Sequence, residues 1–407
     1  MIVKQYIKDF ENLGLGMFVH FGLYSLLEQG EWSMHLLPVE KSEYAKLAKE
    51  FSPDPQWAKK LVATAKNAGC KYITLTTRHH DGYSLYDTCG LSDYDAPHSC
   101  GRDLVREFVD ACNAEGIIPF FYHTLIDWYH PGCPDDWYGY MDYLQDSVEL
   151  LCKNYGKIGG LWFDGYWAYP QNDWRQDQLY GMIRSYQPEA MIINNTGLDA
   201  RGALGHIELD SVTFERGKPQ PLNMEGAPKY VASEMCEVLN DHWGYAKMDF
   251  DYKAPAQLIT EIVECRRYGA NMLLNVGPMG NGLLRPIDTC YFDLIGQWVA
   301  IHDEAIRKPR PTGIAIEEKP DDFVLQDGDT YYLFCLGMPM QTNENVGLPN
   351  GCSFDSRFPF DRTIQSVVWM DNGDAVAFEQ QEGKTLIKTK PFSYGRSMVV
   401  RIAKIQC

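Results

Sequence analysis

Polar side chains able to carry protons or hydrogen bonds follow several short apolar runs of the sequence. They are His20 after MFV, His79 and His80 after TLTTR, Tyr122 and His123 after IIPFF, Asp164 after GGLWF, Asn194 and Asn195 after MII, Glu215 after DSVTF, and Glu234 in YVASEMC. A carboxyl group can act as a nucleophile or as a general acid and base, and the other groups can hold the hydroxyls of a substrate. This set predicts one shared active site, provided that the fold brings the ends of these runs together.

Asp164 has the most specific surroundings of these residues. Trp162 and Phe163 precede it, and Gly165 follows and lets the backbone turn away. From spacing alone, an ordinary Asp-Gly turn at the end of a strand explains the pattern equally well. The aromatic neighbours favour a catalytic carboxylate, because sugars present apolar C–H faces that stack on rings.

The adjacent histidines His79 and His80 suggest a zinc site, since imidazoles are common zinc ligands. Neighbouring residues of a strand point to opposite faces, however, so the two rings would not easily bind one ion. In the turn after a strand, both could instead donate to sugar hydroxyls. We expect no metal, and a metal-dependent barrel hydrolase that uses this pair stays as an alternative.

The Glu31–Trp32 pair places a carboxylate acceptor beside an indole, an arrangement that can hold a pyranose by its hydroxyls. The alternative is a surface glutamate beside a buried tryptophan. Aromatic residues make up 13% of the chain. That content is consistent with a sugar-lined mouth, although half or more of the rings must belong to the core.

The elements that must position these groups alternate regularly from the start of the chain to about residue 305. Helical runs are expected at 56–70, 103–116 and 142–156, and strands at 71–77, 117–124, 159–165 and 191–195. Helices that close with glycine and lead into buried strands are typical of βα repeats. We predict a (β/α)8-like parallel barrel, in which catalytic groups lie at the carboxyl ends of the strands and converge on one mouth.

The sequence changes character near residues 308–320. KPRPTG is read as a proline-rich connector, and short alternating segments follow it: FVLQ, TYYLFCLG, TIQSVVWM, AVAFEQ, TLIKTK and SMVVRIAK. Short strands separated by turn signals, without helices, predict an all-β sandwich. We therefore expect a catalytic barrel over residues 1–308 and a C-terminal β-sandwich over residues 309–407.

Charge and composition narrow the choice of partner and location. The net charge of −18 argues against nucleic acid and anionic membranes, which both need a basic face, and favours a neutral small substrate. No run approaches the roughly 20 apolar residues of a membrane span. The N-terminus lacks the pattern of a signal peptide, although a signal removed earlier would not be visible. Twelve scattered cysteines without a CxxC pair predict mostly buried thiols, and we expect a cytoplasmic location.

Six segments, in order, resemble the α-L-fucosidases of glycoside hydrolase family 29. They are LGMFVHFGLYS (15–25), GEWSM (30–34), TTRHHDGYSLYDT (76–88), GLWFDG (160–165), NDHWGY (240–245) and GANMLLNVGPMGNG (269–282). The match runs from about residue 11 to 305, and the terminal β-module fits the layout of that family. One motif such as HFG would be weak evidence, whereas six in order identify the chain as a member.

The resemblance implies a role for each matching position. The aspartate of the W-F-D-G strand end is the nucleophile of the family, which implies that role for Asp164. The implied fucose-binding residues are His20, Glu31, Trp32, His79, His80, Tyr122, Trp162 and Trp243.

The acid/base lies in a variable region of the family. Glu215 matches its usual placement, 51 residues after Asp164. Glu234 matches another acidic position, so we count it with the substrate-binding residues and as the second choice for the acid/base; Glu225 is the third. Many relatives carry an arginine directly after the asparagine pair, where this chain has Thr196, and Arg201 is a candidate substitute.

The implied reaction is retaining exo-hydrolysis of terminal α-L-fucose from a glycan or glycoconjugate, without a metal or organic cofactor. It requires an ionised Asp164, a Glu215 with a raised pKa, and carboxyl groups roughly 5–5.5 Å apart. A catalytically inactive fucose-binding protein on the same fold is a further alternative. The sequence does not predict the preferred linkage, the natural aglycone, the balance of transfer and hydrolysis, or the oligomeric state.

Overall fold

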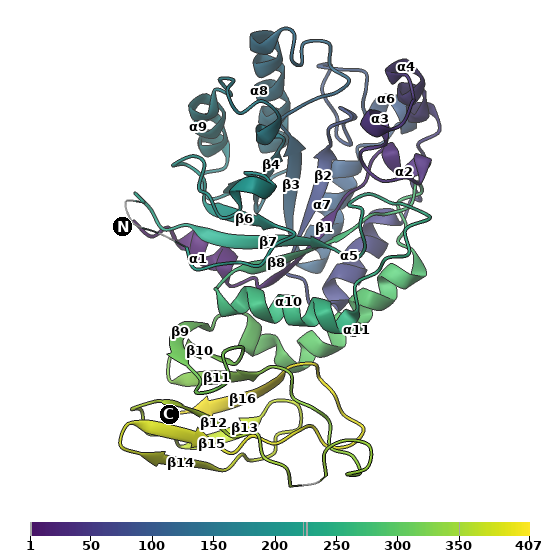
Figure 1. Ribbon diagram of the computed structural model, residues 1–407. Helices are drawn as coiled ribbons and strands as arrows, with labels where there is room; N and C mark the ends of the chain where they lie inside the picture. Colours follow the sequence, from purple (N-terminus) through teal and green to yellow (C-terminus); the bar gives the residue numbers. More distant parts are fainter. Residues whose placement is uncertain (1, 223, 225–226, 350) are drawn as a thin grey trace. The chain divides into compact units, whose positions relative to one another are not determined.

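The computed structural model describes residues 2–222, 224, 227–349 and 351–407. Their contacts divide the chain into two compact units. One consists of Met1–Lys253 and Asn271–Asp293, and the other of Ala254–Ala270 and Leu294–Cys407. The first unit contains a parallel barrel and the second contains antiparallel sheets (Figure 1). The expected domain boundary between residues 308 and 309 stays a prediction.

Eight parallel strands close into a barrel in the order in which they occur in the chain. They are β1 (Leu15–Val19), β2 (Tyr72–Arg78), β3 (Ile118–Thr124), β4 (Gly160–Asp164), β5 (Met191–Asn194), β6 (Ser211–Glu215), β7 (Ala232–Val238) and β8 (Asn271–Val276). β1 pairs with both β2 and β8, which closes the ring. The strands are buried almost throughout, which explains their apolar and hydroxyl-bearing sequences. The predicted barrel and its four predicted strands are confirmed.

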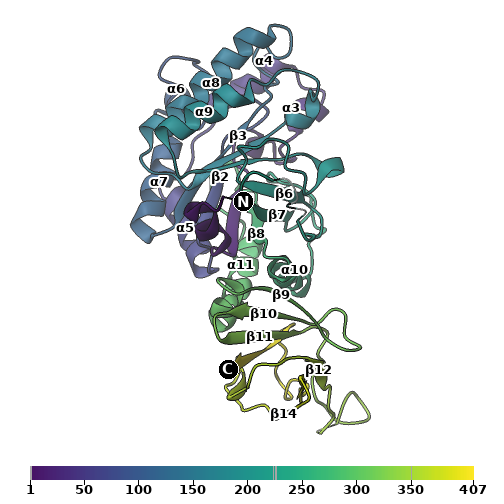
Figure 2. The ribbon, with the colours of Figure 1, turned by 90° about the vertical axis from the view of Figure 1, so that its left-hand side faces the viewer.

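Helices of the first unit follow most of the strands. They are α1 (Gln5–Glu11), α2 (Tyr24–Leu27), α3 (Ser33–Leu36), α4 (Lys41–Tyr44), η1 (Ala45–Lys49), α5 (Trp57–Asn67), α6 (Ala96–Cys100), α7 (Leu104–Glu115), α8 (Trp137–Asn154), η2 (Tyr166–Ala168) and α9 (Gln176–Tyr186). α5 and α7 pack side by side, as do α8 and α9 (Figure 2). α7 ends as predicted at Gly116, whose φ of 70° is the left-handed conformation that glycine tolerates. α8 begins before the predicted residue 142, because the Asp136 side chain caps the Gly139 N–H at 3.2 Å.

Two barrel connections depart from the βα pattern. Between β5 and β6 the chain forms only the short η3 (Leu198–Ala200), and between β6 and β7 the described residues contain no helix. These two connections follow Asn195 and Glu215, so this side of the barrel mouth is built from loops.

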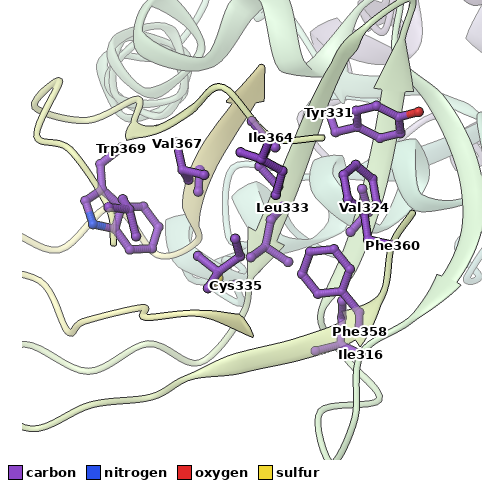
Figure 3. Close-up of a cluster of buried hydrophobic side chains, with 14 of the residues drawn as sticks. Ile316, Val324, Tyr331, Leu333, Cys335, Phe358, Phe360, Ile364, Val367 and Trp369 are labelled. Atoms are coloured by element: carbon purple, nitrogen blue, oxygen red, sulfur yellow. The ribbon is translucent and has the colours of Figure 1, made fainter. Parts of the chain in front are cut away.

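The described residues of the second unit form α10 (Pro255–Arg267), the part of α11 (Pro286–His302) from Leu294 on, η4 (Asp303–Ile306) and eight antiparallel strands. The strands are β9 (Arg310–Ala315), β10 (Phe323–Asp327), β11 (Thr330–Cys335), β12 (Ser356–Pro359), β13 (Ser366–Trp369), β14 (Phe378–Gln381), β15 (Lys384–Ile387) and β16 (Arg401–Gln406). One sheet has the order β13-β16-β11-β10-β9 and the other β12-β15-β14. Buried side chains such as Leu333 and Phe358, one from each sheet, form the core of this unit (Figure 3), which confirms the predicted β-sandwich.

Two local predictions for this unit were wrong. The connector predicted at KPRPTG (308–313) overlaps β9 (Arg310–Ala315), which pairs with β10. Its proline, Pro311, is tolerated because β9 is an edge strand of its sheet. The segment at 397–404 was read as one strand, whereas β16 starts only at Arg401.

The cysteines are less buried than predicted. Six of the twelve are buried, namely Cys70, Cys112, Cys152, Cys236, Cys265 and Cys335, whereas Cys89 and Cys290 are exposed. Among the described residues, no helix combines the length and the apolar character needed to cross a membrane.

Candidate active site

A cavity of about 420 Å³ lies at the carboxyl ends of the barrel strands. Nine of the eleven site residues predicted from the sequence line it: His20, Trp32, His79, His80, Tyr122, Trp162, Asp164, Glu215 and Trp243. The other lining residues are Phe18, Trp167, Asn195, Thr196, Gly197, Leu198, Asp199 and Cys236. Because all eight strands run parallel, their carboxyl ends meet at this one mouth.

Asp164 ends β4 and receives hydrogen bonds on both carboxyl oxygens. Its Oδ2 accepts from the Tyr122 hydroxyl at 3.1 Å and lies 3.3 Å from His80 Nε2. Its Oδ1 accepts from Trp167 Nε1 at 3.0 Å and from Asn195 Nδ2 at 3.2 Å. Gly165 then turns the chain away with a φ of 101°, as the sequence predicted for this glycine.

These donors determine the charge of Asp164. Burial by itself raises the pKa of the carboxyl group, because it disfavours the charged form. The hydrogen bond and charge of His80, together with the bonds from Trp167 and the Gly165 N–H, outweigh burial and bring the pKa below its usual value. Asp164 is therefore an ionised carboxylate at neutral pH.

The amide of Asn195 joins Asp164 to Glu215, which ends β6. Asn195 Nδ2 donates to Asp164 Oδ1 at 3.2 Å and to Glu215 Oε2 at 2.7 Å. Its Oδ1 accepts from the Thr213 hydroxyl at 3.1 Å and the Gly197 N–H at 3.2 Å. Two donors on the oxygen side fix the orientation of the amide, so its NH₂ group faces the carboxylates.

Glu215 has the opposite charge preference to Asp164. Burial, and then the negative charge of Asp164, raise the pKa of Glu215 to about 7, although the Asn195 bond lowers it. Arg201 donates through Nε to the backbone carbonyl of Glu215. Arg201, the candidate substitute for the arginine that many relatives carry at position 196, therefore lies beside the acid/base candidate. Thr196 itself donates its hydroxyl to Ala200 O at 2.7 Å.

His79 and His80 both lie in the turn after β2, with ring centroids 4.3 Å apart, and both line the cavity. The alternation expected within a strand therefore does not separate them. His80 Nδ1 bonds Thr124 Oγ1 at 2.7 Å, and Thr124 donates its own proton to Ile126 O at 2.6 Å. Within the described residues, no group of three or more His, Cys, Asp or Glu side chains could hold a metal ion.

Two imidazoles of the mouth, those of His20 and His79, are neutral at pH 7. Burial lowers the pKa of His20 to about 3, although the hydrogen bond between its Nδ1 and Asn275 Oδ1, 2.7 Å long, opposes the shift. Burial also lowers the pKa of His79 well below its ordinary value. Among the described residues, His79 Nδ1 is a buried atom without a hydrogen-bond partner. These rings can exchange hydrogen bonds with hydroxyl groups.

Aromatic rings form the floor of the cavity. Trp162 stacks on Tyr122 at 5.7 Å and packs edge-on against Phe18 at 5.1 Å between ring centroids. Glu234 lies below this floor: it accepts from Trp162 Nε1 at 2.9 Å and from the Tyr72 hydroxyl. It does not line the cavity, and burial raises its pKa to about 7. Glu234 holds the floor indole in place.

Glu31 also lies outside the cavity lining, and it supports a loop of the wall. Its Oε2 accepts from the Gly244 N–H at 2.7 Å, and burial raises its pKa. The adjacent Trp243 packs against His20 at 5.2 Å between ring centroids. Trp32 does line the cavity. Of the predicted pair, Trp32 therefore forms part of the cavity wall, whereas Glu31 holds the loop that carries Trp243.

Some residues were missed, and some strand-end candidates point elsewhere. Alternation along β3 sends His123 away from Tyr122, so that His123 Nε2 lies 3.3 Å from the Tyr86 hydroxyl. In the same way, Asn194 turns from the mouth and donates to the Tyr180 hydroxyl at 3.1 Å. Trp167 was missed, and its position three residues after Asp164 was the only signal. Glu225, the third choice for the acid/base, lies outside the described residues.

Comparisons with known proteins agree with this geometry. A family model described as α-L-fucosidase matches residues 3–304. The chain is 28% identical over 368 residues to tissue α-L-fucosidase of Bos taurus, covering 81% of this chain and 75% of the relative. It is 26% identical over 382 residues to the Homo sapiens enzyme, covering 84% and 78%.

Among solved structures, α-L-fucosidase isoenzyme 1 from Paenibacillus thiaminolyticus superposes with a TM-score of 0.81 at 28% identity, covering 99% of this chain and 98% of that one. An α-L-fucosidase of family 29 from Bacteroides thetaiotaomicron shares the fold with a TM-score of 0.83 at 22% identity, covering 99% and 95%. Since the family model spans the whole barrel and the site at its mouth, the chain belongs to the α-L-fucosidase family and is a glycoside hydrolase.

Proposed function

We propose that this chain is a retaining exo-α-L-fucosidase in which Asp164 is the nucleophile and Glu215 is the acid/base. The shared amide of Asn195 carries the proposal. Its Nδ2 lies 3.2 Å from an Asp164 oxygen and 2.7 Å from a Glu215 oxygen, so these two oxygens are at most 5.9 Å apart. Retaining enzymes need roughly 5–5.5 Å between the carboxyl groups, whereas inverting enzymes need roughly 6.5–9.5 Å to admit a water.

The charge states support the same division of roles. A nucleophile must be ionised, and the pKa of Asp164 lies below its usual value. A general acid must be protonated, and the pKa of Glu215 is about 7. Two carboxyl groups whose pKa values are driven apart are the pattern expected of a nucleophile and an acid.

In the first step, a carboxylate oxygen of Asp164 bonds to C1 of the fucose as the bond from C1 to the leaving oxygen breaks. Glu215 gives its proton to that oxygen, and the aglycone departs. In the second step, Glu215 takes a proton from water, whose oxygen bonds to C1 and releases Asp164. C1 is inverted twice, so the product keeps the α configuration. A Bacteroides thetaiotaomicron family-29 structure is described as a covalent intermediate trapped with 2-fluoro-fucosyl fluoride in a glutamate-to-glutamine mutant, in keeping with this chemistry.

The cavity walls suit a deoxysugar as the substrate. His20 and His79 are neutral and can bind hydroxyls, and the faces of Trp162 and Phe18 suit the apolar side of a pyranose ring. The substrate is therefore the terminal fucose of an oligosaccharide or glycoconjugate. Because the floor is closed by Trp162 and the glutamate beneath it, only a chain end can enter, which gives exo action.

Removal of the nucleophile tests the assignment. Asp164→Ala should lower kcat for an aryl α-L-fucoside by more than a thousandfold, and azide should restore turnover with β-fucosyl azide as the product. Asp177→Ala, at an exposed aspartate paired with His206, is the control and should behave as wild type. NMR of the wild-type reaction should show α-fucose first. Early β-fucose or an active Asp164→Ala enzyme refutes the assignment, and a wild type without turnover favours the inactive fucose-binding alternative.

A further inference from the structure

A second cavity, of about 740 Å³, lies beside the catalytic cavity and shares Trp32 and Trp167 with it. Its volume lies within the roughly 300–1,000 Å³ typical of ligand pockets. Three segments line it: residues 32–41, the loop after β3 with Trp128, and the loop after β4 with Trp167. All three follow barrel strands at their carboxyl ends, so this cavity opens at the same end of the barrel as the site. We call it the Trp128 cavity.

A continuous row of rings joins the nucleophile to the Trp128 cavity. The indole of Trp167, which donates to Asp164 Oδ1 at 3.0 Å, stacks on Trp32 with ring centroids 5.9 Å apart and an interplanar angle of 16°. Trp32 meets Trp128 edge-on at 5.2 Å. Trp128 in turn stacks on His35 at 5.0 Å and 23°. The row starts at the catalytic carboxylate and ends in the second cavity.

These rings are not core side chains. Trp167 is 37% exposed, His35 is exposed, and Trp32 and Trp128 are half-buried. Flat rings that remain partly open around a hollow offer faces on which the C–H surface of a sugar can stack. Glu40 and Lys41 are exposed at the edge of the cavity and supply an acceptor and a donor for hydroxyl groups.

We propose that the Trp128 cavity is a subsite for the saccharide to which the fucose is attached, so that the enzyme prefers fucosylated oligosaccharides over simple fucosides. The inference rests on the proposed function and identifies its substrate class. Since the catalytic cavity is closed below by Trp162, the rest of a glycan must leave through the mouth, and Trp32 and Trp167 form part of the wall that it crosses. The net charge of −18 favours a neutral saccharide over an anionic ligand there.

This subsite predicts a split between two substrates. Sugar units beyond the fucose gain binding energy in the Trp128 cavity, whereas a nitrophenyl group is too short to fill it. Binding that is equal in the ground and transition states appears in KM rather than kcat. The ring of Trp128 also packs against His80, with centroids 5.2 Å apart. A structural effect alone would travel through His80 to Asp164 and lower the activity on both substrates together.

The test compares 4-nitrophenyl α-L-fucoside with α1-2 and α1-3 fucosyllactose on the full-length enzyme. Trp128→Ala should raise KM for the preferred fucosyllactose about tenfold and leave kcat/KM for the aryl fucoside within twofold. Trp128→Phe keeps a ring and should recover most of the loss. His35→Ala removes the exposed end of the row and should show the same split at about threefold, which tests the inference if Trp128→Ala does not fold. Tyr138→Ala removes a ring that is 60% exposed outside both cavities and should change neither substrate.

The outcomes separate this inference from the proposed function. Suppose that the wild type cleaves the aryl fucoside. If Trp128→Ala and His35→Ala then lose kcat/KM equally on both substrates, or lose none on either, the subsite is overturned and the proposed function stands. The same holds if wild type cleaves the aryl fucoside but neither fucosyllactose. A wild type inactive on every fucoside overturns the proposed function and the subsite with it.

Discussion

Removing the amide of Asn195 should shift the pH profile of the enzyme to more alkaline values. Asn195 donates to Glu215 at 2.7 Å and to Asp164 at 3.2 Å. A donor to a carboxylate stabilises the ionised form and lowers the pKa of that group. In Asn195→Ala both pKa values should therefore rise. Because the activity requires a protonated Glu215 and an ionised Asp164, the basic and acidic limbs should both move to higher pH.

The size of the shift follows from the two bond lengths. A hydrogen bond to a charged group contributes about 1.5–3 kcal/mol, which corresponds to roughly one to two pKa units. The bond to Glu215 is shorter, so its limb should move further, from the pKa of about 7 upward by about one unit. The acidic limb should move by less. We also expect kcat/KM at the optimum to fall about tenfold, because both carboxyl groups lose a shared anchor.

The assay is kcat/KM for an aryl α-L-fucoside between pH 3 and 10, which reports the pKa values of the free enzyme. Asn194→Ala is the matched control, because this neighbouring amide donates to Tyr180 instead of the carboxylates. It should leave both limbs in place. A basic limb of Asn195→Ala that stays fixed or moves to lower pH, in a folded enzyme, would show that the amide does not control Glu215.

Three further predictions address the remaining alternatives. Glu234→Gln should lower the stability by about 1–3 kcal/mol, seen as a lower Tm, because one of the two donors from Trp162 and Tyr72 then faces an NH₂ group. A selective loss on substrates with poor leaving groups, together with azide acceleration on an aryl fucoside with a good leaving group, would instead make Glu234 the acid. Thr124→Val removes the acceptor of His80 Nδ1 and should move the acidic limb of the pH profile upward as Asp164 loses the support of His80, whereas Thr124→Ser should not. EDTA should leave kcat/KM within twofold, because His80 already uses its nitrogens on Thr124 and Asp164; a loss that zinc restores would favour the metal-dependent alternative.

The barrel was predictable because its repeats carry local signals. Helices end at residues such as Gly116, and buried β-branched or aromatic runs follow them. The sandwich was predictable in outline from its alternating strands. The edge strand β9 was not, since Pro309 and Pro311 are typical of a connector and only the position of β9 at the sheet edge permits pairing.

At the site, the sequence predicted well which residues lie together. It predicted less well which role each residue has. Parallel strands bring their ends together whatever the details of packing, so Asp164 and Glu215 could be placed at one mouth. The roles of Asn195 and Glu234 depend on which side chain receives which hydrogen bond across the barrel. Glu234 is separated from Trp162 by 72 residues along the chain, and no local pattern reports that contact.

The loops that follow β5 and β6 can change in length more easily than the connection that follows β4. Around Asp164, a new loop length would displace η2, which begins two residues after Asp164 and carries Trp167, a donor to its carboxylate. Near Glu215, no described helix has to be rebuilt, and doubling a loop costs only about 0.6 kcal/mol in closure entropy. Engineering of the proton donor should therefore begin in the loop after β6, because a longer loop there has a small entropic cost and leaves Asn195, which donates to Asp164, in place.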